Sequence, residues 1–506
     1  MKNIMNSISK NLGAYSTILI IVLSWQICGI GKVDLRLSQG IDQQIMLLTS
    51  AKMHYFDISS YQAAWNHHSP ILFVLTKLTY FFVNFTNASL GFYALYTIIL
   101  LLISFFLFKI LYEFFQNKII AISGSLIFIF DISSSTIGGN VILDNRTIGI
   151  LFQAIILINC LKYIKSKKNT YLYLIAIFSV IQIYNLESYA AAILCIYLYL
   201  IYIENNYVKF FTHSTIGSLL TILYISIINI LNGELDEFFD LNIIFHLDSI
   251  GLTNKFENIS IDVILKNLFI GGNTNLSFFV SLFIVLFIFV NFLIKYRSAS
   301  LDKNEKFIYV LLFGEILHLF LTGPRFVSYS QILVLPIYIL FFVGILRLFD
   351  KIKQPKIFGY FVFFIIFFLL QFGDVVLNRT SLIDGTFGRS IESHKLQAEK
   401  PDLILTWVDI NSYDKLFFKN NSLPATRLWW WHQMKFVDKF YDKTYKMFDD
   451  SLLEDIFIKD LYKEKPNLAI IDTSITNPPS YFSNYIDENF ELLKIDGNIE
   501  IYQLSK

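Results

Sequence analysis

Apolar stretches of about the length that crosses a membrane recur along this chain, and they constrain its fold more than any other feature. A bilayer core requires about 20 apolar residues in a helix. Such stretches become helices because backbone groups in lipid must be hydrogen-bonded within the segment. We predict an α-helical polytopic membrane protein with about eleven spans, at 13–31, 91–112, 118–135, 141–163, 170–186, 188–204, 210–232, 276–296, 306–322, 326–349 and 357–373.

The composition points to the same class of protein. Of the 506 residues, 55% are hydrophobic and only 16% are charged, whereas a soluble domain is about a quarter charged. A net charge of +1 provides no concentrated basic face, so we expect no nucleic-acid partner. The cysteines, Cys28, Cys160 and Cys195, lie inside apolar stretches, which argues against a disulfide framework or a thiolate metal site.

Loop charge gives the orientation of the spans, because lysine and arginine favour the cytoplasmic side. The loops 162–169, 295–306 and 347–356 are basic, whereas the long loop 233–275 is acidic. We therefore predict that the N-terminus is cytoplasmic. The loop 233–275 and the region after residue 373 are predicted to lie outside.

The apolar stretch 70–85 is a twelfth candidate, but it is short and carries Lys77 near its middle. If it crossed the membrane, the basic loop 162–169 would lie outside, against its charge. We therefore predict an interfacial helix over 70–85, and its Pro70 suits a first helical turn.

The chain changes character after residue 373. Residues 1–373 form the predicted transmembrane domain, with a first outer loop at 32–90, and residues 374–506 form a small extracytoplasmic α/β domain. Alternation of apolar and polar residues predicts strands, a hairpin and one amphipathic helix in this domain. The segments are "DLILTWV", "NLAIIDT", "LLEDIFIKDLYKEK" and "FELLKIDGNIEIYQL".

Ionisable residues gather on the predicted outer side, where such residues near the membrane often have a function. They are Asp34, Arg36, Asp42, His54, Asp57, His67 and His68 in the first loop, and Asp144, Arg146, Glu187 and Arg325 at the ends of later spans.

Structural explanations remain open for several of these residues. Asp34 and Arg36 can be solvated loop surface, and Glu187 can mark a turn between two helices. Asp144 and Arg146 can form a local pair at a helix end.

The adjacent histidines His67 and His68 raise the question of a metal site. Neighbouring residues on a helix point in different directions, and no third ligand follows at helical spacing. We therefore predict no metal site.

Arg325 stands apart, because no acidic residue is near it in sequence. A guanidinium beside lipid suits a phosphate, which it binds in a fork geometry. Reaching toward lipid headgroups is the alternative role for Arg325.

Two segments carry a family resemblance. The first is "GIDQQIMLLTSAKMHYFDISSYQAAWNHHSPILF", in which Asp42 matches an acidic opening element, Tyr55 and Asp57 match a middle element, and His68 to Ile71 match a closing H-P-P-L element. The second is "GPRFVSYSQILVLPIYILF", with Arg325, Tyr329 and Pro336. These segments resemble the GT-C superfamily of integral-membrane glycosyltransferases. The nearest types are protein O-mannosyltransferases and the bacterial aminoarabinose and related lipid-phosphate-sugar transferases.

Two later segments, "LPATRLWWW" and "KPNLAIID", are similar to parts of the outer C-terminal domain of that superfamily. The chain departs from the pattern at three positions. Gln43 replaces an acid, Ser69 replaces a proline, and Ser328 stands where histidine is usual. The departures bear on the catalytic assignment more than on the fold.

The resemblance implies transfer of a hexosyl or pentosyl group from a polyprenyl-phosphate donor to a hydroxyl of a glycan, lipid or protein. It also implies a bacterial plasma membrane, and it leaves a divalent cation open as a cofactor. Asp42 is the expected catalytic base, with Asp34 and Asp57 as alternatives. The donor phosphate is expected to contact Arg325, Arg146 and His68. Further substrate-binding candidates are Asp57, Asp144, Glu187 and Tyr329.

Other function classes remain open from the sequence alone. A secondary transporter is one, although such proteins often show inverted repeats and helices broken by glycine or proline. A flippase or ligase of a polyprenyl-linked polysaccharide is another. A non-catalytic relative is a further alternative, because Gln43 and Ser69 depart from the pattern.

Overall fold

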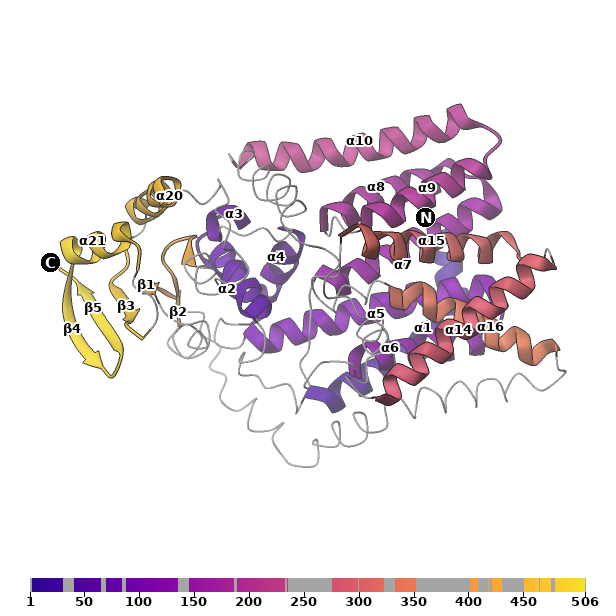
Figure 1. The fold of residues 1–506 in the computed structure, drawn as a ribbon, viewed down its shortest axis with the longest axis horizontal. Helices are drawn as coiled ribbons and strands as arrows, with labels where there is room; N and C mark the ends of the chain where they lie inside the picture. The colour runs from indigo at the N-terminus through magenta and orange to yellow at the C-terminus, as the bar shows by residue number, and fades with distance from the viewer. Residues whose placement is uncertain are drawn as a thin grey trace. The chain divides into compact units, whose positions relative to one another are not determined.

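Helices predominate in the computed structural model of this chain, and a small sheet follows near the C-terminus (Figure 1). The residues that the structure describes are 2–30, 41–64, 70–83, 88–134, 145–185, 189–232, 234, 275–298, 300–322, 333–351, 401–407, 417, 421–429, 450–463, 465–474 and 478–505.

The chain divides into two compact units, and each is described by itself. The first unit comprises residues 1–33, 96–225 and 254–392. The second unit comprises residues 34–95, 226–253 and 393–506. The predicted first outer loop and the C-terminal region thus belong to one unit.

Long apolar helices build the first unit, and most of α5 and α10 belongs to it. Its helices are α1 (Lys2–Ile30), α5 (Ala88–Phe115), α6 (Lys118–Ser134), α7 (Asn145–Ser166), α8 (Asn169–Asn185), α9 (Ala190–Tyr202), α10 (Tyr207–Leu231), α14 (Asn275–Arg297), α15 (Lys303–Thr322) and α16 (Val334–Lys351). Each falls on a predicted span. The predicted span 357–373 lies outside the described residues.

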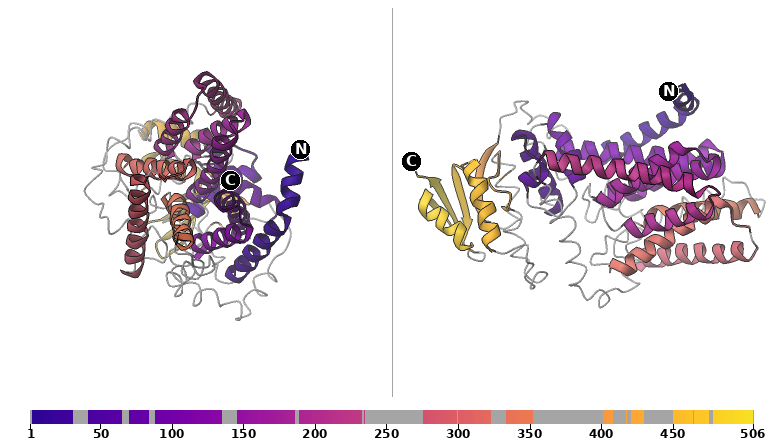
Figure 2. Two further views of the ribbon diagram at one scale, coloured as in Figure 1. Left: turned by 90° about the vertical axis from the view of Figure 1, so that its right-hand side faces the viewer. Right: turned by 90° about the horizontal axis from the view of Figure 1, so that it is seen from above.

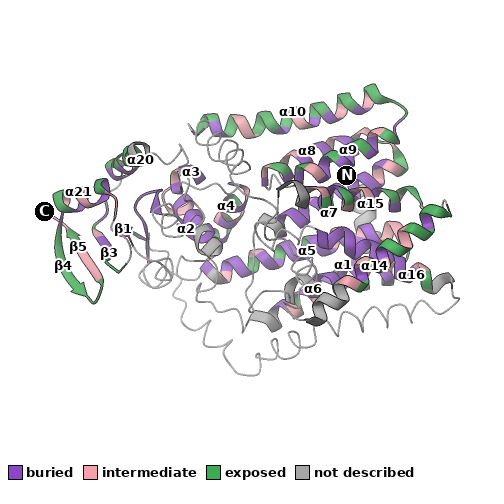
Figure 3. Ribbon diagram, in the orientation of Figure 1, coloured by how far each residue is buried: buried purple, intermediate pink, exposed green. Residues whose placement is uncertain are grey.

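Three of the described helices are long and apolar enough to cross a membrane, at Leu90–Phe115, Thr147–Ser166 and Tyr207–Leu231. Shorter apolar helices lie at Pro70–Phe81, Lys118–Ile129, Ala190–Tyr202 and Val334–Leu348. Much of α10 is exposed (Figure 3), which suits a helix whose side chains face lipid. These helices make the chain a multi-pass membrane protein.

Short turns join consecutive helices in the first unit. Between α5 and α6, Gln116 has a φ of 50°, and the Asn117 side chain accepts hydrogen bonds from the backbone N–H groups of Ile119 and Ile120 at 3.0 and 3.2 Å. This is the N-cap geometry that begins a helix. Lys167 directly follows α7 and, with a φ of 54°, adopts the same left-handed backbone conformation as Gln116. The turn at residues 167–168 leaves α7 and α8 as closely packed neighbours.

Glu204 holds the ends of several helices together at one side of the bundle. Its carboxylate accepts hydrogen bonds from the Tyr163 hydroxyl and from the Lys167 ammonium, the latter at 3.2 Å. It also accepts the backbone N–H groups of Asn205 and Asn206 in the turn before α10. The predicted basic loop 162–169 thus finds its counter-charge in the next loop.

A second ion-pair network joins α14, α15 and α16. Glu305 lies 2.5 Å from the Lys295 ammonium and 2.7 Å from the Arg347 guanidinium. Arg347 also lies 2.9 Å from Asp302. Because Lys295, Glu305 and Arg347 come from three helices, the C-terminal parts of α14 and α16 and the N-terminal part of α15 lie at the same end of the bundle.

The second unit contains the first-loop helices and a sheet. Its helical elements are α2 (Ile41–Tyr55), α3 (Ser60–Ala63), α4 (Pro70–Lys77), the 3₁₀ helix η1 (Leu78–Phe81), α20 (Asp450–Lys463) and α21 (Ser480–Asn489). Its strands are β1 (Asp402–Trp407), β2 (Ser422–Pro424), β3 (Leu468–Asp472), β4 (Phe490–Asp496) and β5 (Ile499–Leu504). The predicted strands β1 and β3, helix α20 and the β4–β5 hairpin are confirmed.

The sheet is mixed, with strand order β2-β1-β3-β5-β4. Figure 2 shows it from two further directions. Strand β1 is parallel to β2 and β3, and the chain between β1 and β3 includes α20, as a parallel connection requires a crossover. Strand β5 is antiparallel to both β3 and β4. Gly497, with a φ of 63°, occupies the hairpin turn.

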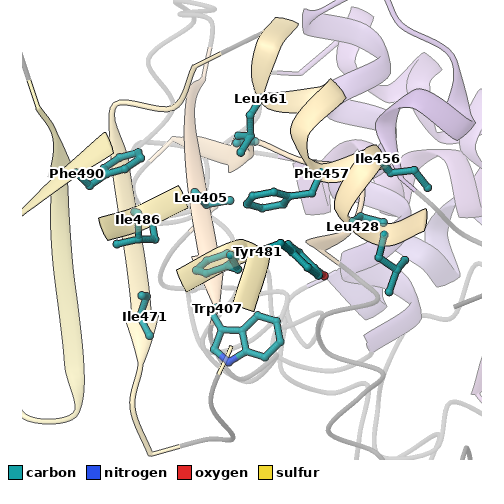
Figure 4. Close-up of a cluster of buried hydrophobic side chains, with 14 of the residues drawn as sticks. Leu405, Trp407, Leu428, Ile456, Phe457, Leu461, Ile471, Tyr481, Ile486 and Phe490 are labelled. Atoms are coloured by element: carbon teal, nitrogen blue, oxygen red, sulfur yellow. The ribbon is translucent and has the colours of Figure 1, made fainter. Parts of the chain in front are cut away.

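A buried aromatic and aliphatic cluster forms the core of this α/β part (Figure 4). Trp407 of β1 contacts Phe482 of α21, with ring centroids 5.6 Å apart, and Phe482 contacts Phe457 of α20 at the same distance. Leu405 and Ile486 complete the cluster between sheet and helices. Burial of these side chains is the main stabilising contribution to the domain.

Candidate functional site

Helices α2 and α4 with η1 form the frame of the predicted first outer loop. Pro70 begins α4, as predicted from its sequence position. The Ser50 hydroxyl donates to the Phe73 carbonyl at 2.9 Å, and the Tyr80 hydroxyl donates to the Leu47 carbonyl at 2.9 Å. These two bonds tie both halves of the 70–81 helix to α2.

The first loop is attached to the C-terminal α/β part through α3 and α2. Tyr61 of α3 is 2% exposed and belongs to the core cluster of the α/β part. The Trp429 indole N–H donates to the Ala63 carbonyl at 3.4 Å, and the Lys52 ammonium donates to the Thr426 carbonyl at 3.3 Å. The segment "LPATRLWWW", noted from sequence, is therefore where the loop and the domain meet.

The segment between α2 and α3 positions Asp57. Asp57 has a φ of 51°, a conformation that aspartate tolerates better than most residues. Its carboxylate lies 3.7 Å from the Lys77 ammonium, but its side chain is 99% exposed. Solvent screens such a pair strongly, so Asp57 is available to a ligand from the aqueous side.

Asp42 lies in the first turn of α2, whereas Asp57 follows the last turn. A helix rises about 1.5 Å per residue, so α2 separates these two acids by roughly 20 Å. The structure therefore does not bring the two candidate bases together. The side chain of Asp42 itself lies outside the described residues, and so does the alternative base Asp34.

His54 is packed among aromatic rings near the end of α2. Its ring centroid lies 4.9 Å from Tyr55, 4.8 Å from Phe81 and 6.0 Å from Tyr80. Burial in this group lowers the pKa of His54 below its usual value of 6.5, and the positive charge of Lys77 lowers it further. His54 is thus a neutral side chain of the frame at physiological pH.

Arg146 lies in the first turn of α7, where the free backbone N–H groups and the helix dipole favour an anion. Its side chain lies outside the described residues, and Arg146 and Asp42 belong to different compact units. The remaining candidates lie outside the described residues altogether, namely His68, Asp144, Glu187, Arg325 and Tyr329.

Within the described ranges, no group of three or more histidine, cysteine, aspartate or glutamate residues is arranged to hold a metal ion. The pair His67–His68 lies outside those ranges.

Sequence reasoning overlooked several polar residues that the structure makes prominent. Lys52 is 4% exposed in α2, and nothing in its sequence surroundings indicates a partner in the C-terminal domain. Glu315 is fully buried in α15. An acidic residue inside the apolar stretch 306–322 was a signal that could have identified Glu315.

The known proteins that this chain resembles were found by similarity of structure. No protein-family model and no curated protein matches the chain. The crystal structure of ArnT from Cupriavidus metallidurans bound to undecaprenyl phosphate matches with a TM-score of 0.53 and 12% identity. The match covers 97% of this chain and 98% of that one.

The oligosaccharyltransferase of Archaeoglobus fulgidus, tethered to an acceptor peptide that contains the NVT sequon, also matches. It has a TM-score of 0.47 and 9% identity, and the match covers 90% of this chain and 69% of that one. At such low sequence identity, structural similarity shows a shared fold alone. The ArnT match extends over nearly the full length of both chains. The chain therefore shares its fold with that ArnT structure over nearly its full length, in agreement with the resemblance noted in its sequence.

Proposed function

We propose that this chain is a membrane glycosyltransferase that uses a polyprenyl-phosphate-linked sugar and transfers the sugar to a hydroxyl group at the outer face of the membrane. The observation that carries the proposal is the fold shared over 97% of the chain with ArnT, whose crystal structure contains undecaprenyl phosphate. The transferred group is a hexose or pentose in this proposal. The acceptor is a cell-surface glycan, a lipid or a protein.

The proposed topology has eleven spans in a bacterial plasma membrane, a cytoplasmic N-terminus and an extracytoplasmic C-terminus. Residues 1–373 form the transmembrane domain and residues 374–506 the outer domain. Lys295 and Arg347 support this topology, because both belong to predicted basic loops and both pair with Glu305. Basic loops favour the cytoplasm.

The helix over 70–81 is proposed to lie on the outer membrane surface. Three large side chains on it, Val74, Leu78 and Phe81, are exposed and recur at helical spacing, and Phe82 directly after it is exposed too. Its other side, with Leu72, Phe73 and Tyr80, is buried. An apolar stripe opposite a packed face suits a helix that rests on lipid.

A lipid-quenching measurement tests this placement. A fluorophore attached at Leu78→Cys should be quenched by brominated lipids in reconstituted membranes. The matched control is Asp57→Cys, which is exposed but lies off the stripe. Equal quenching at both positions would contradict an interfacial helix.

In the proposed reaction, the oxygen of the acceptor hydroxyl attacks the anomeric carbon while the bond from that carbon to the phosphate oxygen breaks. Asp42 takes the proton of the hydroxyl. Arg325, Arg146 and His68 stabilise the charge that grows on the leaving phosphate. Arg146 suits this role because it lies at a helix N-terminus, which attracts anions.

Hydrogen bonds from the sugar and the acceptor are assigned to Asp57, Asp144, Glu187 and Tyr329. Of these four residues, the structure describes the side chain of Asp57, and its nearly full exposure leaves it open to a ligand. The family resemblance implies inversion at the anomeric carbon.

The test uses cells with and without the full-length protein and measures both the lipid-linked sugar pool and surface glycans by mass spectrometry. Loss of the protein should raise one polyprenyl-phosphate sugar and remove one glycan modification. Asp42→Asn should reproduce the loss at normal expression, whereas a base at Asp57 would shift the loss to Asp57→Asn. Unchanged donor and product pools without the protein would refute a transferase and favour a transporter.

A further inference from the structure

Three glutamate or glutamine side chains in the described helices of the first unit are buried with both polar atoms unpaired. Glu315 of α15 is 0% exposed, Gln153 of α7 is 3% exposed and Gln182 of α8 is 1% exposed. In the part of the chain that the structure describes, both carboxylate oxygens of Glu315 and both amide atoms of each glutamine have no partner. Unsatisfied polar groups are costly in a buried setting, so this group requires an explanation.

The two glutamines lie at one level of the α7–α8 hairpin. The rings of Phe152 and Phe178 meet across the hairpin, with centroids 6.1 Å apart. Gln153 follows Phe152, and Gln182 lies one helical turn beyond Phe178 on the same face of α8. Both glutamines are therefore about 20 Å from the turn that joins the two helices.

Glu315 lies near the same level, as close contacts at two glycines indicate. A Cβ added at Gly149 of α7 would lie 2.8 Å from the Tyr189 ring. A Cβ added at Gly314 of α15 would lie 2.7 Å from Ala192, which follows Tyr189 by one turn of α9. Helix α15 also contacts α7 directly. Figure 1 shows α7, α8, α9 and α15 grouped together.

The chemistry of the three side chains favours a ligand with hydroxyl groups. A carboxylate accepts hydrogen bonds, whereas each carboxamide both donates and accepts. A metal ion would use only the oxygens and would leave the amide nitrogens of Gln153 and Gln182 unsatisfied. A hydroxyl group donates and accepts, so a ring with several hydroxyls can satisfy all three side chains.

We propose that Glu315, Gln153 and Gln182 form a subsite that binds the hydroxyl groups of the sugar on a lipid-linked donor. This inference rests on the proposed glycosyltransferase function and adds the residues that select the sugar. Glu315 lies about 10 Å from the outer end of α15 in the proposed topology. That depth suits a sugar whose phosphate is held near the outer membrane surface.

Binding to the full-length protein in lipid nanodiscs tests the subsite. The probes are undecaprenyl phosphate and undecaprenyl phosphate that carries mannose, glucose or arabinose. The wild-type protein should bind at least one sugar-bearing lipid about tenfold more tightly than the bare carrier. Glu315→Gln and Gln182→Leu should each remove most of that preference and leave affinity for the bare carrier unchanged.

Asn159→Leu is the matched control, because Asn159 is also buried in α7 but its amide donates to its own helix at Ile155. The control should keep the preference for the sugar. Modification of Glu315 by dicyclohexylcarbodiimide, measured by mass spectrometry, gives a second readout. The sugar-bearing lipid should protect Glu315, and the bare carrier should not.

Each adverse outcome has a distinct meaning. If the wild-type protein binds bare and sugar-bearing lipids equally, or if the variants keep the preference, the subsite proposal is wrong and the cluster binds only water. If the wild-type protein binds no polyprenyl phosphate at all, the proposed function itself fails. Loss of binding to the bare carrier in Gln182→Leu alone would assign that residue to packing and would also overturn the subsite.

Discussion

At the scale of single residues, the pair Arg427–Asp460 is the best-defined charge interaction in the C-terminal domain. The Asp460 carboxylate accepts the Arg427 backbone N–H at 2.7 Å and the Arg427 Nε–H at 3.0 Å. Both side chains are buried, with exposures of 5% and 10%. Removing Asp460 takes the ion-pair partner and these hydrogen bonds away from a largely buried guanidinium.

We expect Asp460→Ala to lower the free energy of unfolding of the domain by about 3 kcal/mol. Asp496→Ala is the control, because the Lys494–Asp496 pair is mostly exposed, and it should cost less than about 0.5 kcal/mol. Proteolysis of the C-terminal domain in the full-length protein, measured against urea concentration, gives both values. Equal effects of the two substitutions would show that the Arg427 pair contributes nothing beyond its surface counterpart.

The lowered pKa of His54 predicts a pH dependence for the first outer loop. At pH values between the pKa of His54 in the folded protein and 6.5, the unfolded loop binds more protons than the folded loop. Stability is therefore full above pH 6.5 and falls as the pH drops below that value. The loss stops once the pH is below the folded pKa.

The measurement compares protease resistance of the 41–83 region at about pH 7.5 and about pH 5.5. His54→Phe keeps an aromatic ring in the group but cannot take up a proton, so it should lose less stability on acidification than the wild-type protein. An identical loss in both proteins would mean that other groups cause the pH dependence.

At the scale of elements, close approach of helices depends on glycine at a few positions. Gly314 allows α15 to meet α9, because a Cβ there would lie 2.7 Å from Ala192 and 3.0 Å from Cys195. Backbone atoms cannot move aside as a flexible side chain can. Small residues at such crossings are the usual basis of helix association in membranes.

Gly314→Ala should therefore separate α9 from α15 and lower the melting temperature of the detergent-solubilised protein. Overpacking of this kind costs about 1–3 kcal/mol. Gly13→Ala in α1 is the matched control, since nothing lies within 4 Å of an added Cβ there, and it should be neutral or stabilising. Similar melting temperatures for the two variants would contradict tight packing at Gly314.

At the scale of the whole molecule, buried acidic residues pair with basic residues of the loops that are predicted to be cytoplasmic. Glu204 accepts a hydrogen bond from Lys167, and Glu305 pairs with Lys295 and Arg347. Because these networks join the ends of several helices, the basic residues that predict the orientation also hold neighbouring helices together. The proposed topology then places the C-terminal domain outside the cell membrane.

This topology predicts that protease added to intact spheroplasts digests the C-terminal domain but spares the loop 162–169. A reporter fused after residue 88 should likewise indicate the outer side. A cytoplasmic signal at residue 88 would mean that the 70–85 stretch crosses the membrane. In that case the orientation of every later span would have to be reversed.

Much of this fold could be predicted from the sequence, because it depends on interactions within short segments. Apolar stretches became α5, α7 and α10 because a backbone in lipid satisfies its hydrogen bonds within each helix. The hairpin at Gly497 follows from the tolerance of glycine for a positive φ, and the helix that starts at Pro70 follows from the fixed φ of proline, which suits a first helical turn. The predicted span 141–163 likewise placed Arg146 near the start of α7, whereas helix α2, which carries Asp42 in its first turn, was not predicted.

Long-range contacts decided the rest. The three-residue strand β2 is defined by pairing with β1 rather than by a pattern of its own. Lys52 is buried because it meets Thr426, a residue 374 positions away. In sequence, Gln153 and Gln182 do not stand out, and Glu315 is notable only as an acid in an apolar stretch. Their common level in the helix bundle depends on helix packing. The sequence alone determined which long apolar segments become helices and where polar residues are costly, whereas tertiary packing decided which polar groups meet, since contact depends on distance in space.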